Sequence, residues 1–373
     1  MASSIEFRAL TRYYGALRAV DAVDLEVEAG EFVTLLGPSG CGKSTIVRMA
    51  GGFLRPTSGD IIVDGRSVVH LPPQAREIGT VFQHYALFPH MTVAENVGFG
   101  LRVRKWKRAQ IRDRADEMLE LVQLSSFRDF RPPALSGGMQ QRVALARALA
   151  PRPRMVLMDE PLGALDVALR DMMQRELKRI QRELGVTTIY VTHDQDEALF
   201  MSDRIAVMSA GKVEQYATPH DIYHHPRSRF VAEFVGRLNL WTAERVDEGA
   251  STAYRVGDAC IISAGPDDAP SSGDALVGVR PERISVLIQP SIGQSMLRFP
   301  GRVEEVTFRG DADLVAIDVP RLREVVTAQC LTGLWEPGKE VWVEWSPSDL
   351  IVVPTANAPF LAQDKGEGVG VPS

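Results

Sequence analysis

A glycine-rich segment near the N-terminus has the residue types and the spacing that bind phosphate groups. Residues 37–45 read Gly-Pro-Ser-Gly-Cys-Gly-Lys-Ser-Thr, after an apolar run at Phe32–Leu36 and before a helical pattern. Glycines let successive backbone N–H groups turn toward phosphate oxygens, and the start of the helix adds positive potential. In this P-loop pattern Lys43 supplies a charge for the β- and γ-phosphates, and the Ser44 hydroxyl is placed for Mg²⁺. The predicted nucleotide-binding residues are Gly37, Pro38, Ser39, Gly40, Cys41, Gly42, Lys43, Ser44 and Thr45.

Two adjacent carboxylates follow a second apolar run. Residues 154–158 are mostly apolar and lead directly into Asp159 and Glu160. An Asp at the end of a buried strand is the Walker B arrangement, which holds Mg²⁺. A carboxylate one residue further can polarise an attacking water molecule. Glu160 therefore indicates hydrolysis rather than transfer of a phosphoryl group to an acceptor.

A third motif, Leu-Ser-Gly-Gly-Met-Gln at residues 135–140, also suits phosphate because Ser-Gly-Gly precedes a helical pattern. Taken alone, this motif could be an ordinary glycine turn. The chain already has one phosphate-binding loop, so a second phosphate-binding element has a use if two copies of the chain face each other. Each P-loop would then be covered by the Ser-Gly-Gly of the other chain.

These motifs need strands whose ends bring them together. Val23, Leu25 and Val27 alternate with acidic residues, which is typical of a strand with one buried face. Continuous apolar runs at 32–36, 154–158 and 187–192 suit central strands buried on both faces.

Helical patterns lie between the predicted strands. One is charge-rich and amphipathic and covers Lys107–Leu124; another is an apolar stripe from Leu165 to Leu184, which Gly185 ends. Strands that alternate with helices predict an α/β P-loop domain around a mostly parallel sheet, at residues 1–238. Short strand patterns without long helices follow and predict an all-β, OB-like domain at residues 239–356. We expect the Gly- and Pro-rich tail at 357–373 to be disordered.

Composition excludes several classes of protein. The 373 residues are 45% hydrophobic and 24% charged, which is typical of a globular chain of about two domains. The formal net charge of −6 disfavours nucleic acid as a partner. The three cysteines are too widely spaced for a disulfide framework. Without an apolar run of membrane-spanning length or a signal peptide, we expect a protein that is neither secreted nor integral to a membrane.

The three motifs, in this order, resemble those of the ATP-binding subunits of ABC transporters, whose signature motif is similar to residues 135–140. The resemblance implies an ABC nucleotide-binding domain with a helical and an antiparallel β subdomain. By position it implies that Gln83 is the Q-loop glutamine, which senses Mg²⁺, water and the permease. His193 is implied as the switch histidine at the γ-phosphate. Tyr14 is implied as the aromatic residue that stacks on adenine, with Tyr13 as the alternative.

The same resemblance implies that the signature and the D-loop serve a neighbouring copy. Gly163 stands where many members have serine. The catalytic residues implied are Glu160, His193, Gln83 and Lys43, and the Mg²⁺ ligands are Ser44, Gln83 and Asp159. The residues implied at a nucleotide across the dimer interface are Ser136, Gly137, Gly138, Gln140 and Asp166.

The C-terminal part indicates a branch of the family. Gly-Val-Arg-Pro-Glu at 278–282 is similar to a motif of the TOBE regulatory domain of bacterial importers. Residues 222–226 and 230–236 resemble the domain junction of polyamine and iron importers. The resemblance implies an ATPase that powers solute import and is most similar to spermidine/putrescine importers. Iron(III), sulfate, phosphonate and sugar importers are the alternatives.

The resemblance also implies cofactors, partners and location. ATP and Mg²⁺ would bind between two copies arranged head to tail. An integral-membrane permease and an extracytoplasmic solute-binding protein would complete the system, with this subunit on the cytoplasmic face of the inner membrane. The apolar stretch at 86–91 is the expected docking surface for the permease.

A soluble ABC ATPase of DNA repair or translation is the alternative from another class. Repair ATPases of this kind have a long coiled coil between the P-loop and the signature, which is absent from this sequence. Translation ATPases carry two ATPase units in one chain, and this sequence has one set of motifs. A P-loop kinase would lack the Ser-Gly-Gly element.

Overall fold

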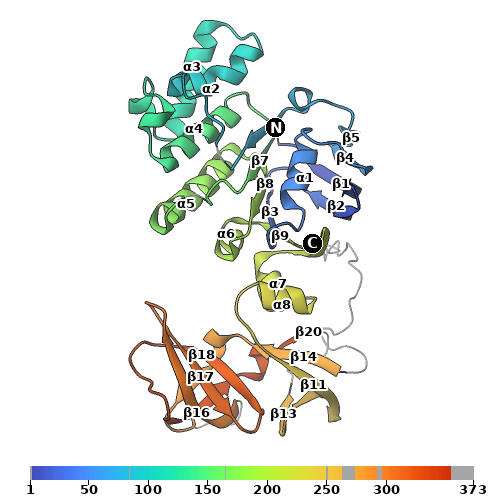
Figure 1. The fold of residues 1–373 in the computed structure, drawn as a ribbon, viewed down its shortest axis with the longest axis vertical. Helices are drawn as coiled ribbons and strands as arrows, with labels where there is room; N and C mark the ends of the chain where they lie inside the picture. Colours follow the sequence, from blue (N-terminus) through green and yellow to red (C-terminus); the bar gives the residue numbers. More distant parts are fainter. Residues whose placement is uncertain are drawn as a thin grey trace, which may run out of the picture. The chain divides into compact units, whose positions relative to one another are not determined.

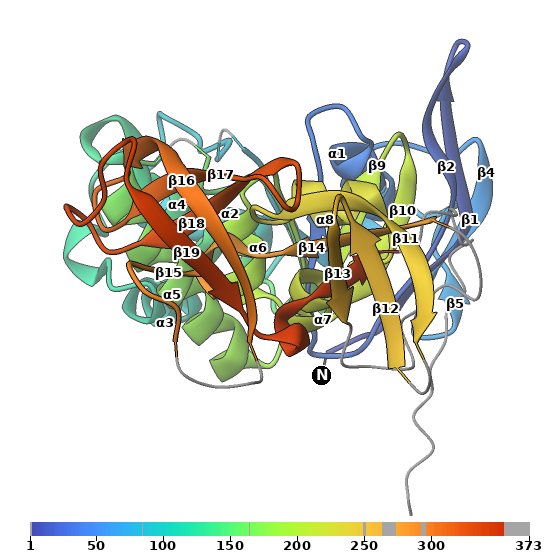
Figure 2. The ribbon, with the colours of Figure 1, turned by 90° about the horizontal axis from the view of Figure 1, so that it is seen from below.

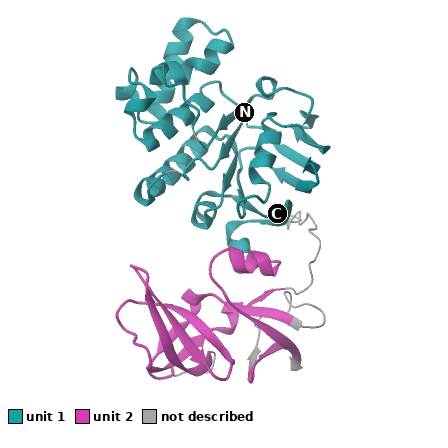
Figure 3. Cartoon of the chain, in the orientation of Figure 1, with its two compact units in different colours: residues 1–222 teal, residues 223–373 magenta. Residues whose placement is uncertain are grey.

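The computed structural model describes residues 2–83, 85–163, 165–248, 251–262, 274–291 and 296–353. The chain divides into two compact units, residues 1–222 and 223–373 (Figure 3). The compact units divide between residues 222 and 223. The predicted domain boundary between residues 238 and 239 stays a prediction. The tail expected at 357–373 lies outside the described residues.

A six-stranded sheet forms the centre of the first unit. Its strands are β10 (Lys212–Ala217), β9 (Arg204–Ser209), β3 (Phe32–Leu36), β8 (Thr187–Thr192), β7 (Met155–Asp159) and β6 (Ile78–Val81), in this spatial order. All neighbours are parallel except β10 and β9. Every residue of β3, β7 and β8 is buried, which confirms the predicted parallel α/β core. The carboxyl ends of these three strands meet at one edge of the sheet.

A smaller antiparallel sheet packs against helix α1 (Lys43–Ala50), which in turn packs against the large sheet. Its strands are β2 (Leu17–Val27), β1 (Ile5–Tyr14), β4 (Ser58–Val63) and β5 (Arg66–Ser67). The alternation predicted around Val23, Leu25 and Val27 is confirmed, because all three side chains are buried. They share one hydrophobic core with α1 and with Val33 and Leu35 of β3. This shared core positions the start of α1 at the edge of the large sheet.

Helices cover the other side of the large sheet. Figure 1 shows α2, α3 and α4 grouped apart from β1, β2 and β4, with the large sheet between them. The helices are α2 (Val93–Val103), α3 (Arg108–Leu121), α4 (Gly137–Leu149), α5 (Val167–Leu184) and α6 (Gln195–Met201). Short 3₁₀ turns occur at Pro73–Ala75, Ser125–Phe127, Pro132–Ala134, Pro281–Arg283 and Pro347–Asp349. No helix in the described ranges is both long enough and apolar enough to cross a membrane.

Helix α5 starts two residues later than its apolar stripe predicts. Asp166 is the N-cap and accepts a hydrogen bond from the Leu169 N–H at 3.0 Å, so Leu165 lies in the preceding turn. The helix ends where expected, because Gly185 adopts a left-handed conformation with φ of 58°.

The second unit contains two antiparallel five-stranded sheets that share one core. The first has the order β13 (Ala259–Ile262), β12 (Ser251–Val256), β11 (Asn239–Glu248), β14 (Asp274–Val279), β20 (Ile351–Val353). The second has the order β15 (Ser285–Leu287), β19 (Glu340–Trp345), β16 (Leu297–Phe308), β17 (Asp313–Val319), β18 (Glu324–Cys330). Figure 2 shows them side by side, and Trp241, Phe299 and Trp345 are buried between them. The all-β prediction for this part is confirmed.

Arg280 joins two short helices, α7 (Pro219–His224) and α8 (Arg229–Phe234), to the β sheets. Its side chain is 1% exposed and donates hydrogen bonds to the carbonyl oxygens of Tyr223 at 2.7 Å, Val235 at 2.7 Å and Arg237 at 3.0 Å. The guanidinium also lies over the Tyr223 ring, 4.0 Å from its centre. The Tyr223 hydroxyl in turn donates to Glu282. The Arg-Pro-Glu motif therefore ties residues 223–237 to the β sheets of the same unit.

We expect Arg280→Met to destabilise the second unit by about 3 kcal/mol, since it leaves the buried Val235 carbonyl and two part-buried carbonyl groups without their charged donor. Urea unfolding followed by tryptophan fluorescence measures this, because four of the five tryptophans lie in residues 223–373. Arg283→Met is the matched control, since Arg283 is half-exposed and its nearest carboxylate, Asp349, is 3.9 Å away. Equal unfolding midpoints for the Arg280 variant and the wild type would contradict this role.

Candidate functional site

The glycine-rich loop connects the end of β3 to the start of α1. Gly37 and Gly42 are required here, because a Cβ atom would lie 2.4 Å from the Met208 carbonyl oxygen in one case and 2.4 Å from the Ala19 carbonyl oxygen in the other. Gly42 also has φ of 109°, in the region that favours glycine. The loop can thus curl tightly, which turns its N–H groups toward a common centre.

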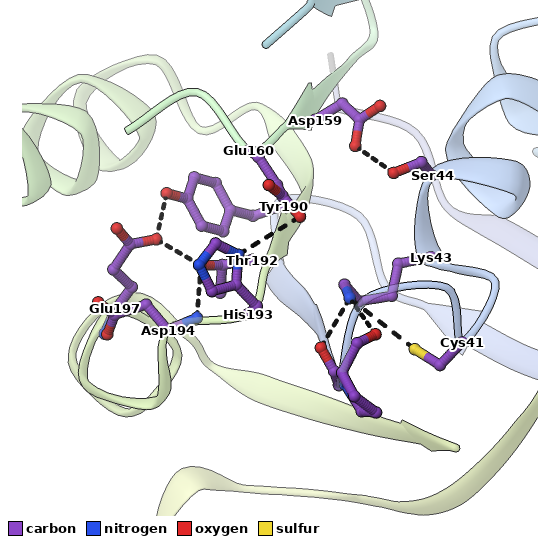
Figure 4. Close-up of polar contacts among 12 residues, drawn as sticks. Cys41, Lys43, Ser44, Asp159, Glu160, Tyr190, Thr192, His193, Asp194 and Glu197 are labelled. Carbon is purple, nitrogen blue, oxygen red and sulfur yellow. Dashed lines mark hydrogen bonds and ion pairs between the residues drawn. The ribbon is translucent and has the colours of Figure 1, made fainter. Parts of the chain in front are cut away.

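Lys43 is the first residue of α1 and its side chain is buried at 4% exposure. Its ammonium group donates to the carbonyl oxygens of Gly37 at 2.7 Å and Pro38 at 3.0 Å (Figure 4). It also lies 3.8 Å from the Cys41 sulfur. Burial raises the pKa of the Cys41 thiol, so this residue stays an uncharged packing group beside the cation.

Ser44 and Asp159 come together from distant parts of the sequence. The Ser44 hydroxyl on α1 donates to the Asp159 carboxylate at the end of β7, at 2.7 Å (Figure 4). Mg²⁺ binds hard oxygen ligands and in nucleotide sites uses one or two protein oxygens together with phosphates and water. This hydroxyl and carboxylate fit such a site.

Glu160 and His193 follow adjacent parallel strands, β7 and β8, in which Asp159 pairs with Val191. A Glu160 carboxylate oxygen lies 3.5 Å from His193 Nδ1. Glu160 has φ of 46°, which is uncommon for a residue with a side chain, and its N–H donates to the Val191 carbonyl at 3.1 Å. Such backbone strain costs on the order of 1–3 kcal/mol and is concentrated at functional sites. The turn presents this carboxylate at the same edge of the sheet as Lys43 and Asp159.

A buried network supports the loop that carries His193, and its residues are not among those predicted from the sequence. Tyr190 and Thr192 each donate to one Glu197 carboxylate oxygen at 2.7 Å, and the Asp194 N–H donates to the Thr192 hydroxyl at 3.0 Å. Asp194 is the N-cap of α6 and accepts from the Glu197 N–H. The Asp-x-x-Glu spacing before a helix is a capping pattern that could have indicated this pair.

Burial raises the pKa of Glu197 above its ordinary value of 4.5. The folded state thus favours the protonated form, so this group's contribution to stability is complete below about pH 4.5 and is lost as pH rises through the raised pKa. Glu197→Gln keeps an acceptor for both hydroxyls and cannot ionise. We expect the free energy of unfolding of this variant to increase relative to wild type as pH rises above 4.5.

Urea unfolding followed by circular dichroism at about pH 4.5, 6 and 8 measures this difference. Glu183→Gln is the control, because Glu183 is about half exposed and pairs with Arg179 on the helix surface. A difference between the Glu197 variant and wild type that does not change with pH would refute the prediction.

Two further predicted residues lie exposed at the surface of the first unit. Tyr14, at the end of β1, is 45% exposed and the Arg12 guanidinium lies 4.8 Å from its ring centre. Tyr13 is less exposed and lies near Arg18. Gln83 is exposed in a turn after β6. The greater exposure of Tyr14 favours it as the stacking residue, and both assignments stay predictions.

The signature residues form the start of α4. Ser136 is the N-cap and accepts from the Met139 N–H at 3.4 Å, and Gly138 is buried against Leu169 of α5. The Gln140 side chain donates to the carbonyl oxygens of Pro132 and Leu135, so it holds the turn before the helix. Within the described residues, no hydrogen bond or ion pair joins residues 136–138 to residues 37–45.

The D-loop lies next to the signature helix and the loop of His193. Asp166 is exposed. Leu165 is buried, and its side chain lies next to Gly137 of the signature motif. Arg170 donates to the Leu165 carbonyl and to the Asp194 carboxylate, both at 3.1 Å. Ala164, in the same predicted loop, lies outside the described residues.

A P-loop, a carboxylate pair and a helix-capping Ser-Gly-Gly around a mostly parallel sheet define an ATP-binding cassette, which is followed here by an all-β C-terminal unit. Residues 20–163 match the family model described as ABC transporter, and residues 277–353 match the model described as TOBE domain. The chain belongs to the ABC transporter family, among its ATP-binding subunits.

Full-length relatives and a solved structure agree with this assignment. The spermidine/putrescine import ATP-binding protein PotA of Thermobifida fusca is 48% identical over 90% of this chain and 88% of its own length. The protein of the same name from Nitrosomonas eutropha is 44% identical over 96% of this chain and 98% of its own length. An ATP-binding cassette solved as a dimer in a post-hydrolysis state with ADP and Pi is 35% identical, with a TM-score of 0.53, over 58% of this chain and 98% of that one.

Proposed function

We propose that this chain hydrolyses ATP to power the import of polyamines, such as spermidine and putrescine, through a membrane permease. The observation that carries the ATPase assignment is the convergence of Lys43, Ser44, Asp159, Glu160 and His193 at one sheet edge. The observation that carries the solute is the identity of 44–52% to several spermidine/putrescine import ATP-binding proteins.

The nucleotide would lie along the P-loop. Lys43 would exchange its carbonyl partners for the β- and γ-phosphates, and Tyr14 would stack on the adenine ring. Ser44, Asp159 and Gln83 would hold Mg²⁺, which supplies positive charge where negative charge develops on the phosphates. The N–H groups of the loop would hold the phosphate oxygens, and the residues concerned are Gly37, Pro38, Ser39, Gly40, Cys41, Gly42 and Thr45.

Hydrolysis would depend on Glu160 and His193. Glu160 would accept a hydrogen bond from the attacking water, orient it and take its proton. His193 would contact the γ-phosphate, held in place by the Glu197 network and by Glu160. Catalysis by these groups consists of positioning and of stabilising charge.

Each complete site would need two copies of the chain. Among the described residues, no hydrogen bond or ion pair joins the exposed Ser136 and Gly137 at the start of α4 to their own P-loop, which supports a role toward another copy. Asp166, which is exposed, would extend this surface, while Gly138 is buried behind it and the Gln140 side chain holds the turn before α4. The similar cassette solved as a dimer supports the arrangement. Closure would follow because ATP offers contacts to both chains at once.

The permease would dock near Gln83. Ala86 is exposed, and Leu87, Phe88 and Met91 are half-buried after it. Phe53 is 51% exposed and its ring centre lies 5.3 Å from that of Phe82. The permease would contact this apolar surface, which consists of residues 86–91 with Phe53 and Phe82. Binding to the permease would hold the subunit on the cytoplasmic face of the inner membrane. An extracytoplasmic solute-binding protein would complete the system.

Uptake assays test the proposal. The chain would be expressed with the permease and solute-binding protein encoded beside it, in a strain lacking polyamine uptake. We expect accumulation of labelled putrescine or spermidine that Glu160→Gln abolishes. Uptake of iron(III), sulfate, phosphonate or a sugar instead would reassign the solute. Failure to co-purify with any permease would favour a non-transport ABC ATPase.

A further inference from the structure

The segment from Tyr85 to the start of α2 has an unusual backbone at its first two residues. Tyr85 and Ala86 are consecutive residues with side chains, and both have left-handed conformations, with φ of 57° and 47°. Such conformations cost free energy and persist only where surrounding groups hold them. The Tyr85 side chain is buried in the core of the helical subdomain, while Ala86 is exposed on the proposed docking surface.

Arg147 of helix α4 holds this segment. Its two terminal nitrogens donate to the carbonyl oxygens of Tyr85 and Ala86, both at 2.6 Å. The planar guanidinium can bond two adjacent carbonyl groups at once, which the single ammonium of a lysine does less well. The guanidinium carbon also lies 5.9 Å from the centre of the Phe88 ring. Burial lowers the pKa of Arg147, as expected for a partly desolvated cation that stays charged.

A second anchor fixes the far end of the segment. Asn96 of α2 is fully buried, accepts from the Phe88 N–H at 2.8 Å and donates to the Phe88 carbonyl at 3.1 Å. The Phe88 ring packs on Phe99 of the same helix, with ring centres 4.4 Å apart. The segment from Tyr85 to Phe88 is therefore bonded at one end to α4 and at the other to α2.

The anchor on α4 has a mechanical consequence. The same helix begins at the signature residues Ser136 and Gly137, about three turns before Arg147. A helix packed in a core transmits a displacement as a rigid body. We propose that Arg147 is a positioning residue that joins the docking segment to the signature helix, so that movement of the permease reaches the signature motif. This rests on the proposed function, since it needs a permease on residues 86–91.

Two variants and one control test the role. Without a permease, we expect Arg147→Met and Arg147→Lys to keep ATP binding and basal ATPase rate within about twofold of wild type. In liposomes with the permease that supports uptake, we expect the permease-stimulated ATPase rate to fall about tenfold for Met and less for Lys. Arg104→Met is the matched control, because Arg104 also donates to a carbonyl, that of Pro151, on the same subdomain.

Hydrogen exchange gives a readout that does not need the permease. We expect amides of residues 85–91 to exchange about tenfold faster in Arg147→Met, with residues 37–45 unchanged. Wild-type stimulation in Arg147→Met, or an equal loss of basal and stimulated rates, would overturn the proposal. If the wild-type chain itself shows no stimulation, the proposed function fails. Unchanged exchange in Arg147→Met would then separately overturn the role of Arg147.

Discussion

Replacing Glu160 with Gln is expected to lower the ATP turnover rate by at least about 100-fold while ATP binding is retained. The amide keeps the size of the side chain and an acceptor oxygen, but it cannot take a proton from water. Lys43, Ser44 and Asp159 are unchanged, so the contacts to the phosphates remain. Because hydrolysis no longer releases the nucleotide, we expect the variant to accumulate as a dimer in the presence of ATP.

Phosphate release measures turnover, calorimetry measures ATP binding, and analytical ultracentrifugation with and without ATP measures the dimer. Glu183→Gln is a suitable control, since this side chain is half-exposed on α5 and pairs with Arg179 on the helix surface. A Glu160→Gln variant that hydrolyses ATP near the wild-type rate would exclude Glu160 as the catalytic carboxylate. A variant that neither binds ATP nor hydrolyses it would point to a structural defect instead.

Replacing Ser136 with Arg is expected to abolish ATPase activity in the homodimer, although the chain's own P-loop is intact. A long charged side chain at the start of α4 would occupy the place of the partner's phosphates. The loss of the N-cap itself costs only about 1 kcal/mol, so the subunit should stay folded. Ser136→Asn is the control, because it keeps a side-chain acceptor for the Met139 N–H, adds no charge and is much smaller than arginine.

A mixture of two inactive variants then decides whether the site is shared. In a two-fold symmetric dimer each defect affects one half of each site. A mixed dimer of Glu160→Gln and Ser136→Arg chains has both defects in one site and none in the other. Random mixing is expected to restore up to about a quarter of the wild-type rate if the sites act independently. Wild-type activity of the Ser136→Arg homodimer would contradict the two-chain site.

Local sequence patterns predicted the elements that carry the chemistry. The strand before the P-loop, β3, and the strand before His193, β8, have the predicted bounds, and β7 ends at Asp159 as expected. These predictions succeed because a central parallel strand is buried on both faces and needs a continuous apolar run. The end of α5 was predictable for an equally local reason, since Gly185 can adopt a left-handed conformation without strain.

Features that depend on distant contacts were not predictable in this way. The left-handed turns at Glu160 and at Tyr85–Ala86 have no glycine to indicate them, and the structure around them holds them in place. In the sequence, the Arg-Pro-Glu motif indicated only that the C-terminal part resembles a TOBE domain. Only the structure revealed that Arg280 bonds residues 223–237 to the β sheets.

The sequence by itself determined which groups are present: the phosphate-binding loop, the carboxylate pair, the signature and the order in which they occur. These follow from side-chain type and from periodicity over a few residues. The tertiary structure decided which groups meet, such as Ser44 with Asp159, Glu160 with His193, and Arg147 with the segment after Gln83. The reason is that strand order and helix packing, set by burial of the whole core, bring together residues that are far apart in the chain.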